Sequence, residues 1–240
     1  LDCALLQRPV AITLMNVVRN ASKNIIFIRH GQSLANVAQV DDPSVIDALL
    51  TELGRNQAES WSDSNAVREL LESVEICLCS PLRRAMETAA LVFKNTCVPI
   101  HINRYAREKY WYLWQCRGVS HEETVEHSKR LCREIGNVES LSFVDKHWNP
   151  EEENAAISNK TPNSFQKLSK ESIQMLSHCL MHHQSTTIAV TCHWGVIEAL
   201  LGIECTNCEL VVTQLDTNSG TFQVVERLQV PDSLLSGGDH

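Results

Sequence analysis

Short runs of apolar, largely β-branched residues alternate with helix-forming segments along this chain. The clearest runs lie at 25–28, 74–79 and 187–191, and a weaker one lies at 99–103. Strands that are buried on both faces of a parallel sheet have this composition, because helices cover both faces. The alternation therefore predicts an α/β fold, a three-layer α/β/α sandwich with a mostly parallel central sheet.

Capping residues indicate where the helices begin. Ser33 is a candidate N-cap for a helix expected at 34–40. Thr51 is a candidate N-cap for a helix expected over about 51–71, whose first turn Gly54 weakens. Ser80 and Pro81 match an N-cap and a first-turn proline before a helix that ends at 93. Further helices are expected at 121–135, 165–180 and 194–201, and strands at 210–213 and 222–225 are predicted to form an antiparallel edge hairpin.

The net charge of the chain disfavours some classes of binding partner. The chain has 240 residues and a net charge of −8, which argues against non-specific binding to nucleic acids or to anionic membranes. Neither an apolar run of membrane-spanning length nor a signal-peptide pattern is visible in the sequence. The length fits one domain over 1–240, and we expect a cytoplasmic protein. The long, irregular segment at about 109–163 is expected to be an insert that forms a cap, because variable loops on a rigid scaffold usually set substrate choice.

Ten cysteines are present, and several lie inside apolar runs. We expect buried, reduced thiols, because a chain of this length builds a core without disulfides. Cys205 and Cys208 form a lone C-x-x-C pair, and no second pair at zinc-site spacing accompanies it. A redox or metal-binding role for this pair is the weakest of the functional alternatives.

Polar residues collect where the predicted strands end. Arg29 and His30 follow the first strand, Arg83 and Arg84 the second, Glu108 the third and His193 the fourth. Ligands of open α/β sheets bind outside the carboxyl ends of the strands, and helix N-termini there favour anions. The convergence predicts a phosphate site.

The residue types suit phosphoryl transfer through a covalent intermediate. A neutral imidazole is a nucleophile near pH 7, and nearby arginines both hold phosphate oxygens and disfavour the imidazolium form. A carboxylic acid such as Glu108 can protonate the departing oxygen and later activate water. Because neither a P-loop lysine nor a cluster of carboxylates at metal spacing occurs, the sequence disfavours metal-dependent hydrolysis, and we expect no cofactor.

Four segments resemble, in the same order, motifs of the histidine phosphatase superfamily, in its phosphoglycerate mutase-like branch. They are RHGQSLAN at 29–36, LTELGRNQA at 50–58, SPLRRAMETA at 80–89 and VTCHWG at 190–195. The last segment departs from the family pattern V-[ST]-H-G-G at Cys192 and Trp194. The resemblance implies a three-layer α/β/α fold and catalysis without a metal.

The resemblance also implies roles for single residues. His30 would be the phosphorylated nucleophile, with Arg29, Arg84 and His193 around the phosphoryl group and Glu108 as the general acid and base. Asn36 would donate to a phosphate oxygen, with Gln32 and Ser33 at the rim of the site.

The sequence favours hydrolysis over phosphoryl transfer between substrates. Cofactor-dependent phosphoglycerate mutases carry a double-arginine stretch and a proline-rich segment after the acid/base glutamate, and 109–163 contains neither. Its tryptophans and its Cys-Arg-Gly segment look more like plant and protist phosphoglycerate mutase-like proteins. We therefore expect a metal-independent phosphomonoesterase that acts on a phosphorylated small molecule or a phosphoprotein. A phosphoglycerate mutase and a non-catalytic phosphate-binding module are the alternatives, and the oligomeric state is left open.

Overall fold

A seven-stranded sheet forms the centre of the molecule, which a computed structural model describes over residues 22–38, 45–108, 113–135, 141–143 and 162–235. The strands are ordered β4-β3-β2-β5-β1-β6-β7. The strands are β1 (Ser22–Arg29), β2 (Ile76–Cys79), β3 (Ile100–Ile102), β4 (Leu141–Phe143), β5 (Thr187–Cys192), β6 (Leu210–Asp216) and β7 (Phe222–Leu228). The helices are α1 (Leu34–Ala38), α2 (Glu52–Ser62), α3 (Arg68–Glu72), α4 (Arg83–Val92), α5 (His121–Ile135), α7 (Pro162–His182) and α8 (Trp194–Leu201), with 3-10 turns η1 (Arg104–Ala106), η2 (Trp114–Cys116) and η3 (Asp232–Leu234).

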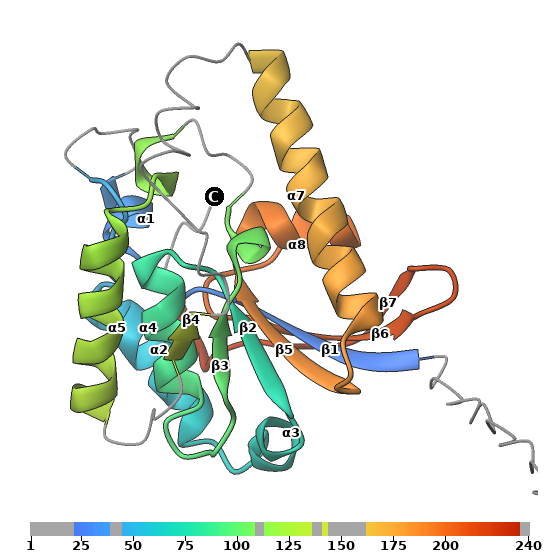
Figure 1. Cartoon of the computed structure of the whole chain (residues 1–240). Helices are drawn as coiled ribbons and strands as arrows, with labels where there is room; N and C mark the ends of the chain where they lie inside the picture. Colours follow the sequence, from blue (N-terminus) through green and yellow to red (C-terminus); the bar gives the residue numbers. More distant parts are fainter. Residues whose placement is uncertain (1–21, 39–44, 109–112, 136–140, 144–161, 236–240) are drawn as a thin grey trace, which may run out of the picture.

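Helices cover both faces of the sheet, which confirms the predicted sandwich. Figure 1 shows α2, α4 and α5 on one side and α7 and α8 on the other. Successive side chains of a strand point to opposite faces, so β1 feeds both layers: Ile26 and Ile28 pack with α2 and α4, whereas Ile25 and Phe27 pack with α7 and α8. Burial on both faces is the reason why this strand is apolar without alternation.

Strands β1 to β5 pair with one another in parallel, whereas β6 pairs antiparallel with both β1 and β7. β1 pairs with β5 on one side and with β6 on the other, and β6 continues into β7 through the turn near Gly220. The predicted edge hairpin is therefore confirmed. Parallel pairing brings the carboxyl ends of β1, β2 and β5 to one edge of the sheet, where the candidate site lies.

Two helix predictions were wrong in detail. The helix expected at 51–71 is two helices, α2 and α3, because Asp63, Ser64 and Asn65 between them are weak helix formers that favour turns. Ser80 does not cap the next helix: α4 begins at Arg83 after Leu82. The Ser80 hydroxyl accepts from the Leu82 amide at 3.3 Å, just before the helix, and also contacts the imidazole of His193, which the sequence pattern alone does not reveal.

Part of the expected cap region belongs to the sandwich. Helix α5 packs on α4 through the buried Leu131, and β4 pairs with β3. Residues 109–112, 136–140 and 144–161 of that region, which include Trp111 and Trp148, lie outside the described residues. None of the described helices is long and apolar enough to span a membrane.

Candidate active site

A cavity of about 710 Å³ opens at the edge where β1 ends and α4 and α8 begin. Six of the eight site residues predicted from the sequence line it: Arg29, His30, Ser33, Asn36, Arg84 and Glu108. His193 and Gln32 are not among its lining residues. The carboxyl ends of separate strands thus deliver one histidine, two arginines and one glutamate to a common space.

The hydrogen bonds of His30 determine its tautomer. Its Nδ1 lies 2.7 Å from the carbonyl oxygen of Gly31, which can only accept, so Nδ1 carries the proton. Its Nε2 accepts a hydrogen bond from Nε of Arg84 at 3.2 Å. Burial and the charges of Arg84 and Arg29 hold the pKa of His30 well below its usual value, and the Gly31 carbonyl opposes this only in part. At neutral pH the imidazole is therefore uncharged, with its Nε2 lone pair on the side of Arg84.

The backbone around His30 is held from both sides. Its carbonyl oxygen accepts hydrogen bonds from Asn207 Nδ2 at 3.0 Å and from the Cys208 amide at 3.2 Å. The next residue, Gly31, runs so close to Gly54 of α2 that a Cβ on Gly31 would lie 2.4 Å from the Gly54 carbonyl oxygen. Glycine is required at this close approach for the strand end to pass the start of α2.

Arg84 and Arg29 are both buried and both contribute to the positive charge beside His30. Arg84 also donates from Nη1 to the Gln115 carbonyl at 2.8 Å. Arg29 donates from Nη1 to the Cys205 carbonyl at 2.6 Å, and its buried Nε has no hydrogen-bond partner. An unpaired buried donor on a cation beside an uncharged imidazole suits an anionic oxygen.

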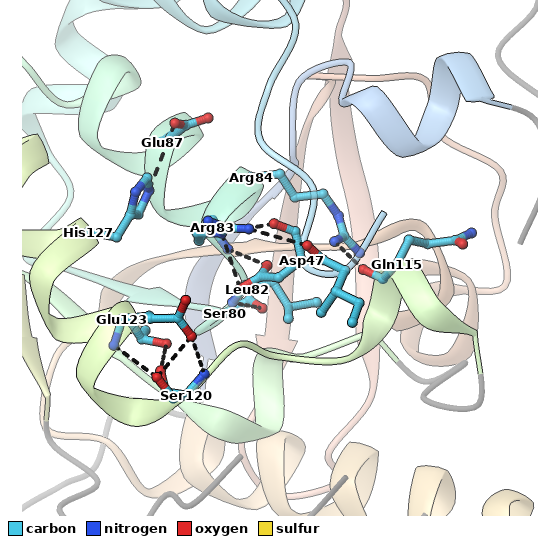
Figure 2. Close-up of polar contacts among 12 residues, drawn as sticks. Asp47, Ser80, Leu82, Arg83, Arg84, Glu87, Gln115, Ser120, Glu123 and His127 are labelled. Carbon is cyan, nitrogen blue, oxygen red and sulfur yellow. Dashed lines mark hydrogen bonds and ion pairs between the residues drawn. The ribbon is translucent and has the colours of Figure 1, made fainter. Parts of the chain in front are cut away.

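Asp47 positions the start of α4, the helix that carries Arg84 (Figure 2). This fully buried carboxylate accepts a hydrogen bond at Oδ1 from the Arg83 amide at 2.8 Å, and Arg83 Nε donates to the Asp47 carbonyl at 2.9 Å. Arg83 is the first residue of α4, so Asp47 supplies the acceptor that an N-cap side chain usually provides. Of the two adjacent arginines, Arg83 is bound to Asp47 and Arg84 lines the cavity.

His193 is fully buried beside His30, although it is not among the residues that line the cavity. Its ring centroid is 5.1 Å from that of His30, and its Nε2 is 2.7 Å from the Ser80 hydroxyl. Burial, Arg84 and His30 hold the pKa of His193 well below its usual value, so it is also neutral. Its Nδ1 is buried and has no hydrogen-bond partner. Glu108 reaches the cavity from the loop after η1, and its Oε2 accepts from the Gly195 amide at the start of α8 at 3.4 Å.

The three residues predicted for substrate binding differ in placement. Ser33 and Asn36 line the cavity, and the Ser33 hydroxyl donates to Asn36 Oδ1 at 2.8 Å, which leaves the amide nitrogen of Asn36 as its donor group. Gln32 instead accepts at its side-chain oxygen from the Thr51 hydroxyl at 2.8 Å. Gln32 therefore joins the loop after β1 to the start of α2.

Sequence reasoning missed the residues that complete the cavity. They come from the segment after η1, from the loop between α8 and β6, and from β7, and comprise Leu113, Gln115, Cys116, Glu204, Cys205, Thr206 and Arg227. The segment after η1 and the loop between α8 and β6 lack hydrophobic periodicity, and the C-x-x-C pair of that loop did not indicate a phosphate site. The weak signal was Trp194, which stands where the family pattern has glycine and which lines the cavity.

The cysteines are free thiols wherever the structure describes them. Nine cysteines are described and none of them forms a disulfide, although Cys97 is exposed rather than buried. Burial raises the pKa of the Cys205 thiol to about 12 and that of Cys208 further still, so both thiols are protonated at neutral pH. Within the described ranges, no three histidine, cysteine, aspartate or glutamate side chains are grouped to hold a metal ion.

Residues 25–209 match the family described as "Histidine phosphatase superfamily (branch 1)". The chain is 35% identical over 77 residues to a "Phosphoglycerate mutase-like protein" of Arabidopsis thaliana, a stretch that covers 30% of this chain and 28% of that protein. It is 28% identical over 177 residues to the "Adenosylcobalamin/alpha-ribazole phosphatase" of Salmonella typhimurium, covering 73% and 76% of the two chains.

The fold is shared with solved structures. Superposition on the alpha-ribazole phosphatase of Shigella flexneri gives a TM-score of 0.52 at 21% identity and covers 90% of this chain and 100% of that one. At this identity the likeness concerns the fold alone.

Proposed function

Because the chain belongs to branch 1 of the histidine phosphatase superfamily, we propose that it hydrolyses phosphomonoesters through a phosphohistidine at His30. The observation that carries the proposal is the state of His30. It is uncharged, its Nδ1 proton is bound to the Gly31 carbonyl, and its Nε2 borders a cavity that two arginines also line. These are the properties of a nitrogen nucleophile for an anionic phosphorus centre.

In the first step, His30 Nε2 forms a bond to phosphorus while the bond from phosphorus to the ester oxygen breaks. Arg29 and Arg84 donate to the phosphoryl oxygens as their charge shifts, with the unpaired Nε of Arg29 as one donor. His193 Nδ1 and the Asn36 amide nitrogen are the further donors of this proposal. Glu108, in its acid form, gives its proton to the leaving alkoxide.

In the second step, the Glu108 carboxylate takes a proton from water, whose oxygen attacks phosphorus. The bond from phosphorus to Nε2 breaks, inorganic phosphate leaves, and both residues return to their starting states. Arginine charges and imidazole nitrogen supply what the reaction needs, so the proposal requires no metal or cofactor.

Hydrolysis is favoured over the mutase reaction by the lack of the double-arginine and proline-rich signature in 109–163 and by the phosphatase name of the relative with the longest overlap among those described above. We propose a phosphorylated small molecule as the substrate. The residues at 113–116 that line the cavity are proposed to belong to a cap within a single domain over 1–240.

The test is hydrolysis of p-nitrophenyl phosphate with EDTA present. We expect turnover by the wild type and none by His30→Ala, whereas His178→Ala, an exposed histidine on α7 away from the cavity, should keep wild-type activity. Acid-labile, alkali-stable phosphate on the quenched wild type would identify the phosphohistidine. Activity that survives in His30→Ala would overturn the proposal.

The acid role of Glu108 has its own readout. Glu108→Gln should slow esters of alkyl alcohols by at least about 100-fold and p-nitrophenyl phosphate far less, because only poor leaving groups need the proton. Equal losses on both would remove this role. Incubation with 3-phosphoglycerate separates the alternatives, since a mutase yields an isomer and the proposed enzyme yields inorganic phosphate.

A further inference from the structure

The cavity beyond the phosphoryl position has an apolar wall. Ala35, Leu113, Cys116 and Trp194 line it, from three separate segments of the chain: α1, the turn η2 with its N-cap, and the start of α8. Trp194 is the first residue of α8, directly after His193. Its indole Nε1 donates to the Glu204 carboxylate across the loop, and this hydrogen bond orients the ring. A large planar apolar surface is thus held beside the site where the ester oxygen would leave.

The charges on the same side do not favour a second anion. Beyond Arg29 and Arg84, the cation among the described lining residues is Arg227. Its Nε lies 2.6 Å from Oε1 of the fully buried Glu209, and its Nη2 donates to the Glu204 carbonyl at 2.7 Å, so its charge is already compensated. The Glu204 carboxylate adds a negative charge to this rim. A carboxylate or second phosphate on the substrate would find an unfavourable field there.

Resting on the proposed phosphatase function, we propose that the substrate is the phosphate monoester of an uncharged alcohol that carries an aromatic or similarly large apolar group. That group lies against Trp194 and Leu113, while the phosphate occupies the arginine pocket. Burial of apolar surface supplies the binding energy, and the acidic rim discriminates against anionic alcohols such as glycerate.

The experiment compares 2-naphthylmethyl phosphate with ethyl phosphate. Both are esters of primary alcohols, so the chemistry of the leaving groups is matched and kcat/KM reports the organic group. We expect the wild type to favour the naphthylmethyl ester over ethyl phosphate and over 3-phosphoglycerate, each by at least about 10-fold, the minimum for filling an apolar pocket. Trp194→Ala should reduce the first ratio to within about threefold of unity, mainly through KM.

Two variants test whether the aromatic face of Trp194 and the charge of Glu204 cause the preference, and a third variant is the control. Trp194→Phe keeps an aromatic face, so it should keep most of the preference, and it also tests the idea if the alanine variant folds poorly. Glu204→Gln should raise relative activity on 3-phosphoglycerate several-fold, because it removes the negative rim charge. Val225→Ala, an exposed position on β7 away from the cavity, should leave both ratios unchanged.

The outcomes separate the two proposals. Hydrolysis of p-nitrophenyl phosphate with no preference for the naphthylmethyl ester, or a preference that Trp194→Ala does not reduce, would overturn the substrate class and leave the phosphatase function standing. A wild type that hydrolyses none of the esters would overturn the phosphatase function, and the substrate class with it.

Discussion

Replacement of Asp47 by alanine tests whether this buried side chain positions Arg84. The change removes the acceptor of the Arg83 amide at the start of α4. Loss of such a cap costs about 1 kcal/mol, and the φ of 46° at this position, which aspartate tolerates better than alanine, adds about 1 kcal/mol more. We therefore expect the free energy of unfolding to fall by about 2 kcal/mol.

Charge contributes less than the cap at this position. Burial raises the pKa of Asp47, and the contact from its Oδ2 to Arg83 Nε is 3.6 Å, so desolvation offsets much of the attraction. Asp47→Asn keeps the oxygen acceptor and should lose less than about 1 kcal/mol. Because Arg84 is the next residue of α4, a shift of about 1 Å in Asp47→Ala should also lower kcat/KM by about 100-fold.

Urea unfolding and p-nitrophenyl phosphate kinetics measure these effects. Asp63→Ala is the matched control, because the contacts of this exposed aspartate are a surface ion pair with Lys94 at 3.2 Å and long hydrogen bonds from Ser62 and Asn95, so the change should alter stability by less than about 0.5 kcal/mol. The reasoning is refuted if Asp47→Ala is as stable and active as the wild type. Equal losses in the asparagine and alanine variants would show that charge, not capping, is the stabilising property.

Two further predictions concern the close approach beside His30 and the pH dependence of stability. A Cβ on Gly54 would lie 2.0 Å from the Gln32 carbonyl oxygen, so Gly54→Ala should displace the loop that follows His30 and lower kcat/KM by at least about 100-fold. Gly202→Ala is the control, because φ is +67° there but no atom lies within 4 Å of the added Cβ. This variant should lose only about 1 kcal/mol of stability and no activity. Burial, then Arg130, lowers the pKa of His127 from 6.5 to about 4, so the unfolded chain binds this proton first and stability falls as pH drops from 6.5 to 4. His127→Gln should flatten that fall by about 3 kcal/mol in unfolding experiments at a series of pH values, and an unchanged slope would contradict the assignment.

The sequence was informative wherever burial and periodicity coincide. The strands at 25–28 and 187–191 were predicted because both faces are covered, and their polar ends identified the residues that now share one cavity. The helices at 121–135 and 194–201 were predicted with their observed bounds. Their limits follow from local side chains, which a sequence reading can evaluate.

The residues that sequence reasoning missed depend on tertiary contacts. Asp47 caps α4 from 36 positions away, and Asn207 binds the His30 carbonyl from 177 positions away. Ser80 had the local signature of an N-cap, and its hydroxyl does bind the nearby Leu82 amide, but the contact of this hydroxyl with His193 spans 113 positions and has no local signal. Cavity walls formed by the loop at 204–206 have no periodic pattern, so only their packing against β1 and α8 reveals them.

The position of β1 in the sheet has a consequence for biosynthesis. Its two neighbours, β5 and β6, follow much later in the sequence. Asn24 of β1 pairs with Thr187 of β5, which lies 163 residues further on. At about 5–20 residues per second, a ribosome needs about 8–33 s to supply that partner. During this interval the Ile-Ile-Phe-Ile segment emerges with no strand beside it, and such segments self-associate readily. Productive folding of this topology is therefore favoured by shielding of the first strand until β5 and β6 have been synthesised.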